Sequence, residues 1–291
     1  MIKNRYASLA VIIFIYVLAV FGGIFSYDFF DGYFSEGNKE PLPFWLSLFL
    51  ADIAATILVF IFSLIFRNAS VYDPYWSVQP PVILAVAISK MNTCGNGANL
   101  LSWLLFAAVL FWALRLTSNW AYNFKSFEYQ DWRYVMLKEK TGPVYPLINF
   151  LGIHMFPTLV VYLCILPAVT AIVKGAVFKP VCAVFIALSF VAAIFQGIAD
   201  IQMHKFRNSG VGGFIQTGLW KKSRHPNYAC EILMWWGIGL ASLIAMGGPW
   251  WLLAGAAVNT LMFLFVSIPM ADKHQARKQG FEEYKKNTRM M

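Results

Sequence analysis

The chain has 291 residues, of which 59% are hydrophobic and 13% are charged, and its mean hydropathy is +0.60. Soluble domains are about 45–50% apolar and about 25% charged, so the composition excludes an ordinary water-soluble globule, a disordered chain and a collagen-like chain. The net charge is +9, but the cations lie between long apolar runs rather than on a solvated face, which argues against a nucleic-acid partner. The composition therefore predicts an integral membrane protein.

Eight apolar stretches approach the length of about 20 residues that a helix needs to cross a bilayer core of about 30 Å. Each is bounded by charged residues or by Gly and Pro, and the third is the shortest. We therefore predict an all-α polytopic transmembrane helix bundle with about eight spans. These spans are expected at residues 7–26, 44–66, 78–91, 99–116, 146–171, 180–200, 227–246 and 250–270.

The distribution of Lys and Arg predicts the orientation of the spans. Nineteen of the 23 cations fall on the side of the two termini, and the other side has Lys39, Lys90, Lys174 and Lys179. By the positive-inside rule, both termini and three polar loops are cytoplasmic. A bacterial inner membrane and an endoplasmic reticulum membrane predict the same pattern. We treat residues 1–291 as one membrane domain, with spans one and two in 1–70, a core in 71–291 and a cytoplasmic tail at 271–291.

The four cysteines indicate neither a disulfide framework nor a metal site. They are far apart in the sequence and form no CxxC pair, which is the spacing that a metal or redox site would favour. No other metal-ligand pattern is evident, so we predict no metal. The cysteines are expected to be buried apolar fillers: Cys94, Cys164, Cys182 and Cys230.

The segment 196–231 contains the strongest signal for chemistry. Gln196 and Asp200 are four residues apart, and so are Asn227 and Glu231, so each pair shares one helix face at the predicted cytoplasmic boundary. Pro226 favours a helix start, where free N–H groups and the helix dipole suit phosphates. Cations gather between the two pairs, namely Lys205, Arg207, Lys221, Lys222, Arg224 and His225. This segment therefore predicts a site for a phosphorylated ligand, although cations that only set topology or contact anionic lipid remain the alternative.

Two acids within apolar helices are candidates for function. An ionisable group at the centre of a membrane helix costs about 2.5–3.5 kcal/mol unless it has a partner, and Asp52 and Glu231 both face this cost. The alternative is that each acid pairs with another helix and serves association. His154 is expected to be a core histidine with its hydrogen bonds satisfied, and Arg115 a snorkelling cation at the end of a span.

A second polar cluster precedes the third predicted span. Asp73 and Pro74 form a helix start, and the cluster contributes hydroxyls, a carboxylate and an amide. Tyr and Trp are also common at membrane interfaces, so an aromatic belt is the alternative. The polar and aromatic members are Tyr72, Asp73, Tyr75, Trp76 and Gln79.

Several short motifs occur in a family order over about three quarters of the chain. They are DPYW at 73–76, LRL at 114–116, DWRY at 131–134, AD at 199–200, GLWKKSRHPNYACE at 218–231 and FEEY at 281–284. With these motifs the chain resembles the membrane proteins that carry the steroid 5-alpha-reductase C-terminal domain, in their bacterial-type branch. The RHPNY piece alone is shared with sterol reductases and isoprenylcysteine carboxyl methyltransferases, so the order of the motifs carries the resemblance.

The resemblance implies an oxidoreductase that uses NADPH to reduce an activated C=C bond, an enone, in a steroid-like or other hydrophobic lipid. Residues 71–291 would then form a reductase-like core. The matching positions imply cofactor contacts for Gln196, Asp200, Arg207, Arg224, His225, Asn227, Tyr228 and Glu231. Of these, Glu231 would lie deepest, toward the nicotinamide.

The catalytic candidates are less clearly matched. Reduction of an enone needs a donor for the developing enolate oxygen and then a proton, and an aromatic-lined cavity open to lipid would select the substrate. Our candidates, in order of preference, are Tyr75, Asp73, Asp52 and Gln79, with Glu231 as the catalytic residue nearest the cofactor. The 5-alpha-reductases place a Gln-Glu pair near the substrate carbonyl, and this chain has no such dipeptide. Lys273 and Arg277 stand where those enzymes have His and Tyr.

Two other functions remain open. A lipid or prenylcysteine methyltransferase that uses S-adenosylmethionine would have a similar cytoplasmic mouth, but its cofactor has no phosphate and needs fewer cations. A non-enzymatic sterol- or lipid-binding membrane protein would retain the scaffold without the activity. In each case the expected partners are a hydrophobic small molecule and membrane lipids, with no nucleic acid and no obligate protein partner.

Overall fold

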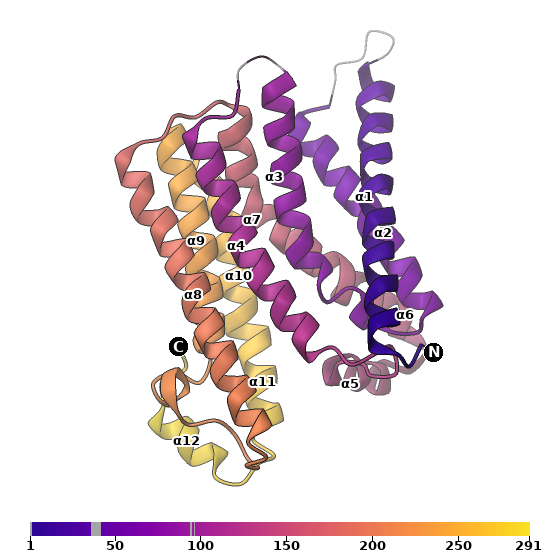
Figure 1. Cartoon of the computed structure of the whole chain (residues 1–291), viewed down its shortest axis with the longest axis vertical. Helices are drawn as coiled ribbons and strands as arrows, with labels where there is room; N and C mark the ends of the chain where they lie inside the picture. The colour runs from indigo at the N-terminus through magenta and orange to yellow at the C-terminus, as the bar shows by residue number, and fades with distance from the viewer. Residues whose placement is uncertain (1, 36–41, 94, 96) are drawn as a thin grey trace. The chain divides into compact units, whose positions relative to one another are not determined.

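The computed structural model describes residues 2–35, 42–93, 95 and 97–291, so the predictions for Lys39 and Cys94 lie outside the described residues. Within these ranges the chain forms helices and no strands, apart from one isolated bridge between Ser223 and Arg289 (Figure 1). The predicted all-α class is therefore confirmed.

The helices follow the predicted apolar stretches. They are α1 (Arg5–Ser35), α2 (Phe44–Ile65), α3 (Tyr75–Thr93), α4 (Leu100–Asn123), α5 (Trp132–Thr141), α6 (Tyr145–Ile148), α7 (Phe156–Val173), α8 (Pro180–Asn208), α9 (Pro226–Met246), α10 (Ala254–Met262), α11 (Ile268–Gln275) and α12 (Phe281–Asn287). Short 3-10 turns occur at Ala69–Val71, Gly142–Val144, Gly218–Lys221 and Trp250–Leu253. Two π-helical segments, Asn149–Met155 and Phe263–Ser267, continue into α7 and α11.

Seven helical stretches in the described ranges are long and apolar enough to cross a membrane, which supports an integral multi-pass protein. They are Arg5–Phe30, Phe44–Ile65, Leu100–Asn123, Trp132–Val173, Pro180–Asn208, Pro226–Met246 and Trp250–Gln275. The difference from about eight expected spans is α3. Its 19 residues correspond to about 28 Å of helix, but they include Pro80, Pro81 and polar side chains that lower its hydropathy. The cytoplasmic location of the termini remains a prediction.

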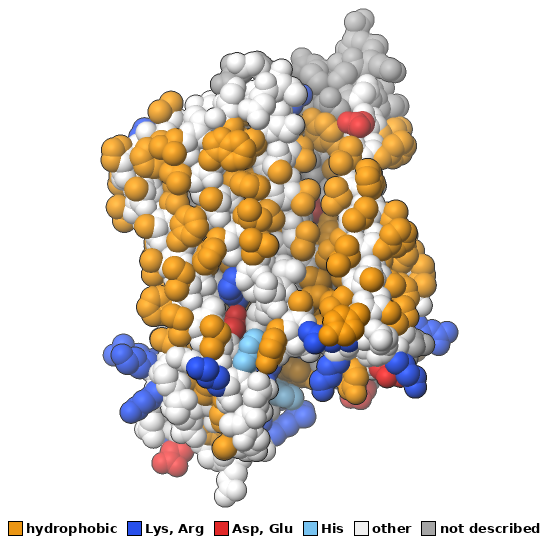
Figure 2. All heavy atoms as spheres, viewed as in Figure 1, with side chains coloured by type: hydrophobic (Ala, Val, Ile, Leu, Met, Phe, Trp, Pro, Cys, Tyr) orange, Lys and Arg blue, Asp and Glu red, His pale blue; other side chains and the backbone are white. Residues whose placement is uncertain are grey.

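The chain divides into two compact units, which we describe separately. Unit 1 comprises Met1–Val86 and Leu116–Tyr162, and unit 2 comprises Ala87–Arg115 and Leu163–Met291. In Figure 2, hydrophobic side chains cover the lengths of α1 in unit 1 and α8 in unit 2, as expected for lipid-facing helices. Lys and Arg side chains gather near the start of α1 and near the end of α8. The sequence division at residue 70 remains a prediction.

In unit 2 the close packing of α8 against α9 positions the predicted cofactor residues (Figure 1). A Cβ atom at Gly237 would lie 2.2 Å from Ser189 Oγ and 2.6 Å from the Phe185 carbonyl, so glycine permits this approach. Ser189 also donates a hydrogen bond to the Met234 carbonyl at 3.0 Å. Cys164 and Cys182 are buried as expected, whereas Cys230 is only half-buried, so the expectation is wrong for that residue.

Candidate functional site

The carboxylate of Glu231 is the centre of a buried polar network in unit 2. Its Oε2 accepts hydrogen bonds from Trp112 Nε1 at 2.9 Å and Gln196 Nε2 at 2.6 Å. Its Oε1 accepts from Trp235 Nε1 at 3.0 Å, and only 4% of the residue is exposed. The two indoles also contact each other edge to face, with centroids 4.9 Å apart. Both carboxylate oxygens are therefore already occupied by protein donors.

Arg115 supplies the positive charge of this network. It is the last residue of the part of α4 that belongs to unit 2. Its Nη1 donates to Asp200 Oδ2 at 2.8 Å, and its Nη2 donates to Gln196 Oε1 at 3.0 Å and lies 3.7 Å from Glu231 Oε2. The side chains of Arg115 and Asp200 are each 13% exposed, so this ion pair is well shielded from water. Sequence reasoning treated Arg115 as a snorkelling residue and missed this role. One signal in the sequence could have indicated it: Asp200 and Glu231 are acids in apolar helices, and such acids need a cation nearby.

Asn227 lies at the start of α9, next to this network. Gln196 Nε2 donates to the Asn227 carbonyl at 3.1 Å, which ties the first turn of α9 to α8. The side-chain amide of Asn227 is half-buried and makes no hydrogen bond among the residues that the structure describes. Exposed cations occupy the last turn of α8, at Lys205 and Arg207, and the connection from α8 to α9, at Lys221 and Lys222. The Asn227 amide, a helix N-terminus and exposed cationic side chains together suit a phosphorylated ligand.

Arg224 and His225, which were predicted to contact the cofactor, lie against the C-terminal part of the chain. Arg224 Nη2 donates to Asp272 Oδ2 at 3.1 Å, and His225 Nε2 lies 2.9 Å from Asp272 Oδ1. Tyr228 stacks on the His225 ring, with centroids 5.3 Å apart, and also contacts Phe263. Burial lowers the pKa of His225, although Asp272 opposes the shift. Their predicted cofactor contacts remain predictions, and their present partners are protein groups.

In unit 1 the structure brings together three of the predicted donor residues. Tyr75 OH donates to Asp52 Oδ1 at 3.0 Å, and Gln79 Nε2 donates to Asp52 Oδ2. All three residues are buried, Asp52 on α2 and the other two on α3. Gln79 Oε1 has no hydrogen-bond partner in the described ranges. Because a buried polar atom without a partner is costly, this oxygen is a feature that the fold alone does not explain.

A chain of hydroxyls extends from this cluster, and sequence reasoning missed it. Thr56 hydrogen-bonds Tyr75, Thr158 Oγ1 lies 3.2 Å from Thr56 Oγ1, and Tyr72 OH lies 2.8 Å from Thr158 Oγ1. Single threonines in apolar helices are too common to be informative in a sequence. His154 packs on Tyr72 and is fully buried, as predicted, but its Nε2 has no hydrogen-bond partner in the described ranges, so the expectation that its hydrogen bonds are satisfied is wrong in part.

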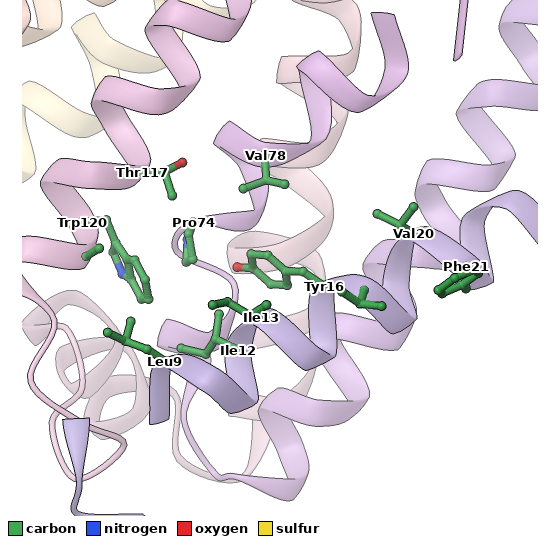
Figure 3. Close-up of a pocket in the computed structure, with 12 residues that line it drawn as sticks. Leu9, Ile12, Ile13, Tyr16, Val20, Phe21, Pro74, Val78, Thr117 and Trp120 are labelled. Carbon is green, nitrogen blue, oxygen red and sulfur yellow. The ribbon is translucent and has the colours of Figure 1, made fainter. Parts of the chain in front are cut away.

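An apolar cavity of about 580 Å³ lies in unit 1, between α1, the start of α3 and the end of α4 (Figure 3). Ile13 and Phe21 of α1 line it together with Val78 and Trp120. Tyr16 lies on the wall with its hydroxyl directed toward Pro74, donates to the Val71 carbonyl at 2.7 Å, and packs edge-on against Tyr75 at 5.8 Å. This volume falls in the range of about 300–1,000 Å³ that is typical of small-molecule sites.

Asp73, the second-preferred catalytic candidate, bonds to a different set of residues. It accepts hydrogen bonds from Tyr134 OH on α5 and from Ser70. Burial raises the pKa of Asp73 to about 6, although Arg133 opposes the shift. Asp73 therefore joins the start of α3 to α5. It shares no hydrogen-bond partner with Asp52 among the described residues.

This shift predicts a pH dependence of stability. Because folding favours the protonated Asp73, its contribution is complete below about pH 3.8 and is lost as the pH rises to about 6. We expect Asp73→Asn, relative to the wild type, to gain up to about 3 kcal/mol of stability between pH 4 and pH 7. Melting curves in detergent across this pH range measure the difference. Glu139→Gln, at an exposed position on α5, is the control, and parallel curves for wild type and Asp73→Asn would contradict the assignment.

Replacing Glu231 tests the buried network. A glutamine has one acceptor oxygen, so Glu231→Gln leaves at least one indole or amide donor without a partner and removes the charge opposite Arg115. We expect a loss of about 3 kcal/mol and a melting temperature about 5–10 °C lower. The exposed Glu282→Gln serves as the control. An unchanged melting temperature would show that the network does not hold the helices together.

Comparisons with known proteins agree with a membrane family of this kind. The model of the family described as "Protein of unknown function (DUF1295)" matches residues 59–288, a range that includes α3 to α12. The chain is 27% identical over 242 residues to "Uncharacterized protein C594.04c" of Schizosaccharomyces pombe, which covers 73% of this chain and 68% of that protein. No solved structure matches the chain. The chain belongs to the DUF1295 family of membrane proteins, a family related to steroid 5-alpha-reductase-like proteins.

Proposed function

We propose that the protein uses NADPH to reduce an activated C=C bond in a hydrophobic lipid. The observation that carries this proposal is the hydrogen bond between Tyr75 and Asp52, a buried acid on the membrane-spanning helix α2 of unit 1 that also accepts a hydrogen bond from Gln79. An acid at this depth costs about 2.5–3.5 kcal/mol on the insertion scale unless it has a partner. The partners of Asp52 among the described residues, Tyr75 and Gln79, are neutral, so the chain retains a buried acid beside a phenol, an arrangement suited to proton transfer.

Each residue of this cluster has a role in the proposed reaction. The Tyr75 hydroxyl hydrogen-bonds the enolate oxygen that develops on the substrate and transfers its proton to it, which gives an enol that tautomerises to the saturated carbonyl compound. Asp52 in its protonated form orients that hydroxyl and returns a proton to the phenolate, and a proton from water then restores Asp52. The free oxygen of Gln79 binds a hydroxyl or another donor at the polar end of the substrate, and the apolar cavity beside Tyr16 accommodates its hydrocarbon part. Bound NADPH supplies the hydride.

The donor set at the start of α9 fits a dinucleotide in part. The exposed cations in the last turn of α8 and in the connection to α9 suit its phosphates, and the free amide of Asn227 and the carboxylate of Asp200 suit ribose hydroxyls or a carboxamide. Gln196 and Glu231 bond to each other and to the indoles, so they hold this end of α8 and α9 in place. In this assignment they orient the contact residues and do not themselves touch the cofactor.

A methyltransferase that uses S-adenosylmethionine is the rival enzyme. Its cofactor lacks phosphate, so it would leave the cations at Lys205, Arg207, Lys221 and Lys222 without a ligand. A lipid-binding protein without activity would need neither the cations nor the Tyr75–Asp52 pair. The charges and the buried acid together favour the reductase.

Cofactor binding can be measured without a known substrate. We expect the full-length protein in detergent to bind NADPH, detected by its fluorescence, more tightly than S-adenosylmethionine. Asn227→Ala should weaken NADPH binding by about fivefold to tenfold, because one hydrogen bond of about 1 kcal/mol is lost. Asn287→Ala, at an exposed amide on α12, should bind normally. Binding of S-adenosylmethionine without NADPH would support the rival enzyme and contradict the proposal.

Turnover tests the buried phenol. With lipid enones as substrates, beginning with a 3-oxo-4-ene steroid, we expect Tyr75→Phe to lower the rate of NADPH oxidation by at least about a hundredfold. NADPH affinity should not change, because the cofactor contacts are on other helices. Tyr6→Phe removes an exposed hydroxyl and is the matched control. A normal rate in Tyr75→Phe would exclude Tyr75 as the donor.

A further inference from the structure

The last residues of the chain form hydrogen bonds with the loop that leads into α9. We call residues 281–290 the C-terminal strap. The Arg224 backbone N–H donates to the Arg289 carbonyl at 2.9 Å, and Ser223 and Arg289 form the parallel bridge. Tyr284 OH donates to the Trp220 carbonyl. The strap therefore pairs with this loop through its backbone, and the pairing does not depend on its exposed side chains.

The Arg224 guanidinium also binds the strap. Its Nη1 donates to the Thr288 carbonyl at 2.7 Å and to the Lys285 carbonyl at 3.0 Å. Its side chain is only 9% exposed. Phe281, at the start of the strap, is buried and contacts the Phe214 ring edge to face at 5.3 Å. An arginine so enclosed, with protein acceptors on both Nη atoms, fits a direct phosphate contact poorly.

Asp272, near the end of α11, holds the guanidinium in this position. Its Oδ2 accepts from Arg224 Nη2, and its Oδ1 lies 2.9 Å from His225 Nε2. Lys285 Nζ of the strap lies 3.9 Å from the same carboxylate. Asp272 is therefore the point at which α11, the strap and the loop before α9 meet.

His225 connects this cluster to the first turn of α9. It is the N-cap residue of α9, and its carbonyl accepts hydrogen bonds from the Tyr228 and Ala229 N–H groups, both at 3.1 Å. Its ring stacks on Tyr228. A displacement of His225 would therefore move the first turn of α9 and, with it, the amide of Asn227.

We propose that Asp272 is a positioning residue for the cofactor: through Arg224 and His225 it fixes the strap and sets the place of the Asn227 amide. This inference rests on the proposed function. It assigns Arg224 and His225 to the support of the site, and it leaves the phosphates to the exposed cations. It also makes the strap part of the site, although none of its side chains need touch the ligand.

The test uses the full-length chain in detergent, with NADPH as the probe and two independent readouts. The first is the NADPH dissociation constant, and the second is hydrogen exchange of the backbone N–H groups in residues 281–290. The variants are Asp272→Asn, Asp272→Glu and a truncation after Tyr284, which removes the carbonyls of Lys285 and Thr288 but keeps the Asp272–His225 contact. Glu283→Gln, an acid-to-amide change at an exposed position, is the matched control.

We expect Asp272→Asn to speed exchange in the strap and to weaken NADPH binding by about tenfold or more, since charge-assisted hydrogen bonds are lost. Asp272→Glu should restore part of both, the truncation should weaken binding, and Glu283→Gln should behave as the wild type. Hydrogen exchange at wild-type rates in the strap of Asp272→Asn would overturn the inference. So would an NADPH affinity that stays unchanged when Asp272→Asn or the truncation releases the strap. If Asp272→Asn does not fold, the truncation decides in the same way. A wild type that binds no NADPH would instead overturn the proposed function, and this inference with it.

Discussion

The structure of unit 2 depends on how a carboxylate is accommodated in an apolar helix. Glu231 receives hydrogen bonds from two indole N–H groups and an amide, and Arg115 lies close by. These donors come from α4, α8 and α9, so one carboxylate fixes the relation of three helices. The close approach at Gly237 places α8 and α9 near enough for these bonds. This arrangement therefore also sets the position of Asn227, in the first turn of α9.

Unit 1 accommodates its buried acid in a different way. Asp52 is bonded by Tyr75 and Gln79, which are neutral. Both oxygens of Glu231 accept hydrogen bonds from protein donors, and the Arg115 cation lies nearby. Asp52 has a phenol as a partner, a hydroxyl chain behind it and an amide oxygen without a donor beside it. This contrast separates a structural carboxylate from one that is suited to proton transfer, although both have the same appearance in the sequence.

The sequence predicted the helices well, because the length and boundaries of apolar runs determine where a membrane helix can form. It overestimated the apolar character of α3, a continuous helix whose hydropathy is lowered by Pro80, Pro81 and polar side chains. Spacing also predicted that Gln196 and Glu231 belong to one site. Spacing could not show that Gln196 and Glu231 accept hydrogen bonds from protein donors rather than bind a ligand, because the donors Trp112 and Arg115 are distant in the chain. Nor could it show that Arg224 binds backbone carbonyls of the last residues, because carbonyls have no sequence signature.

The most direct test of this account is a map of the full-length protein in lipid nanodiscs with NADPH. We expect density for the dinucleotide beside the Asn227 amide at the start of α9, with phosphates toward Lys221 and Lys222. Glu231 would still be bonded to Trp112 and Trp235 in that map. Density in which the nicotinamide contacts Glu231 directly, with the indoles released, would contradict the structural role assigned to this carboxylate. A nucleotide bound away from α9 would contradict the assignment of the site.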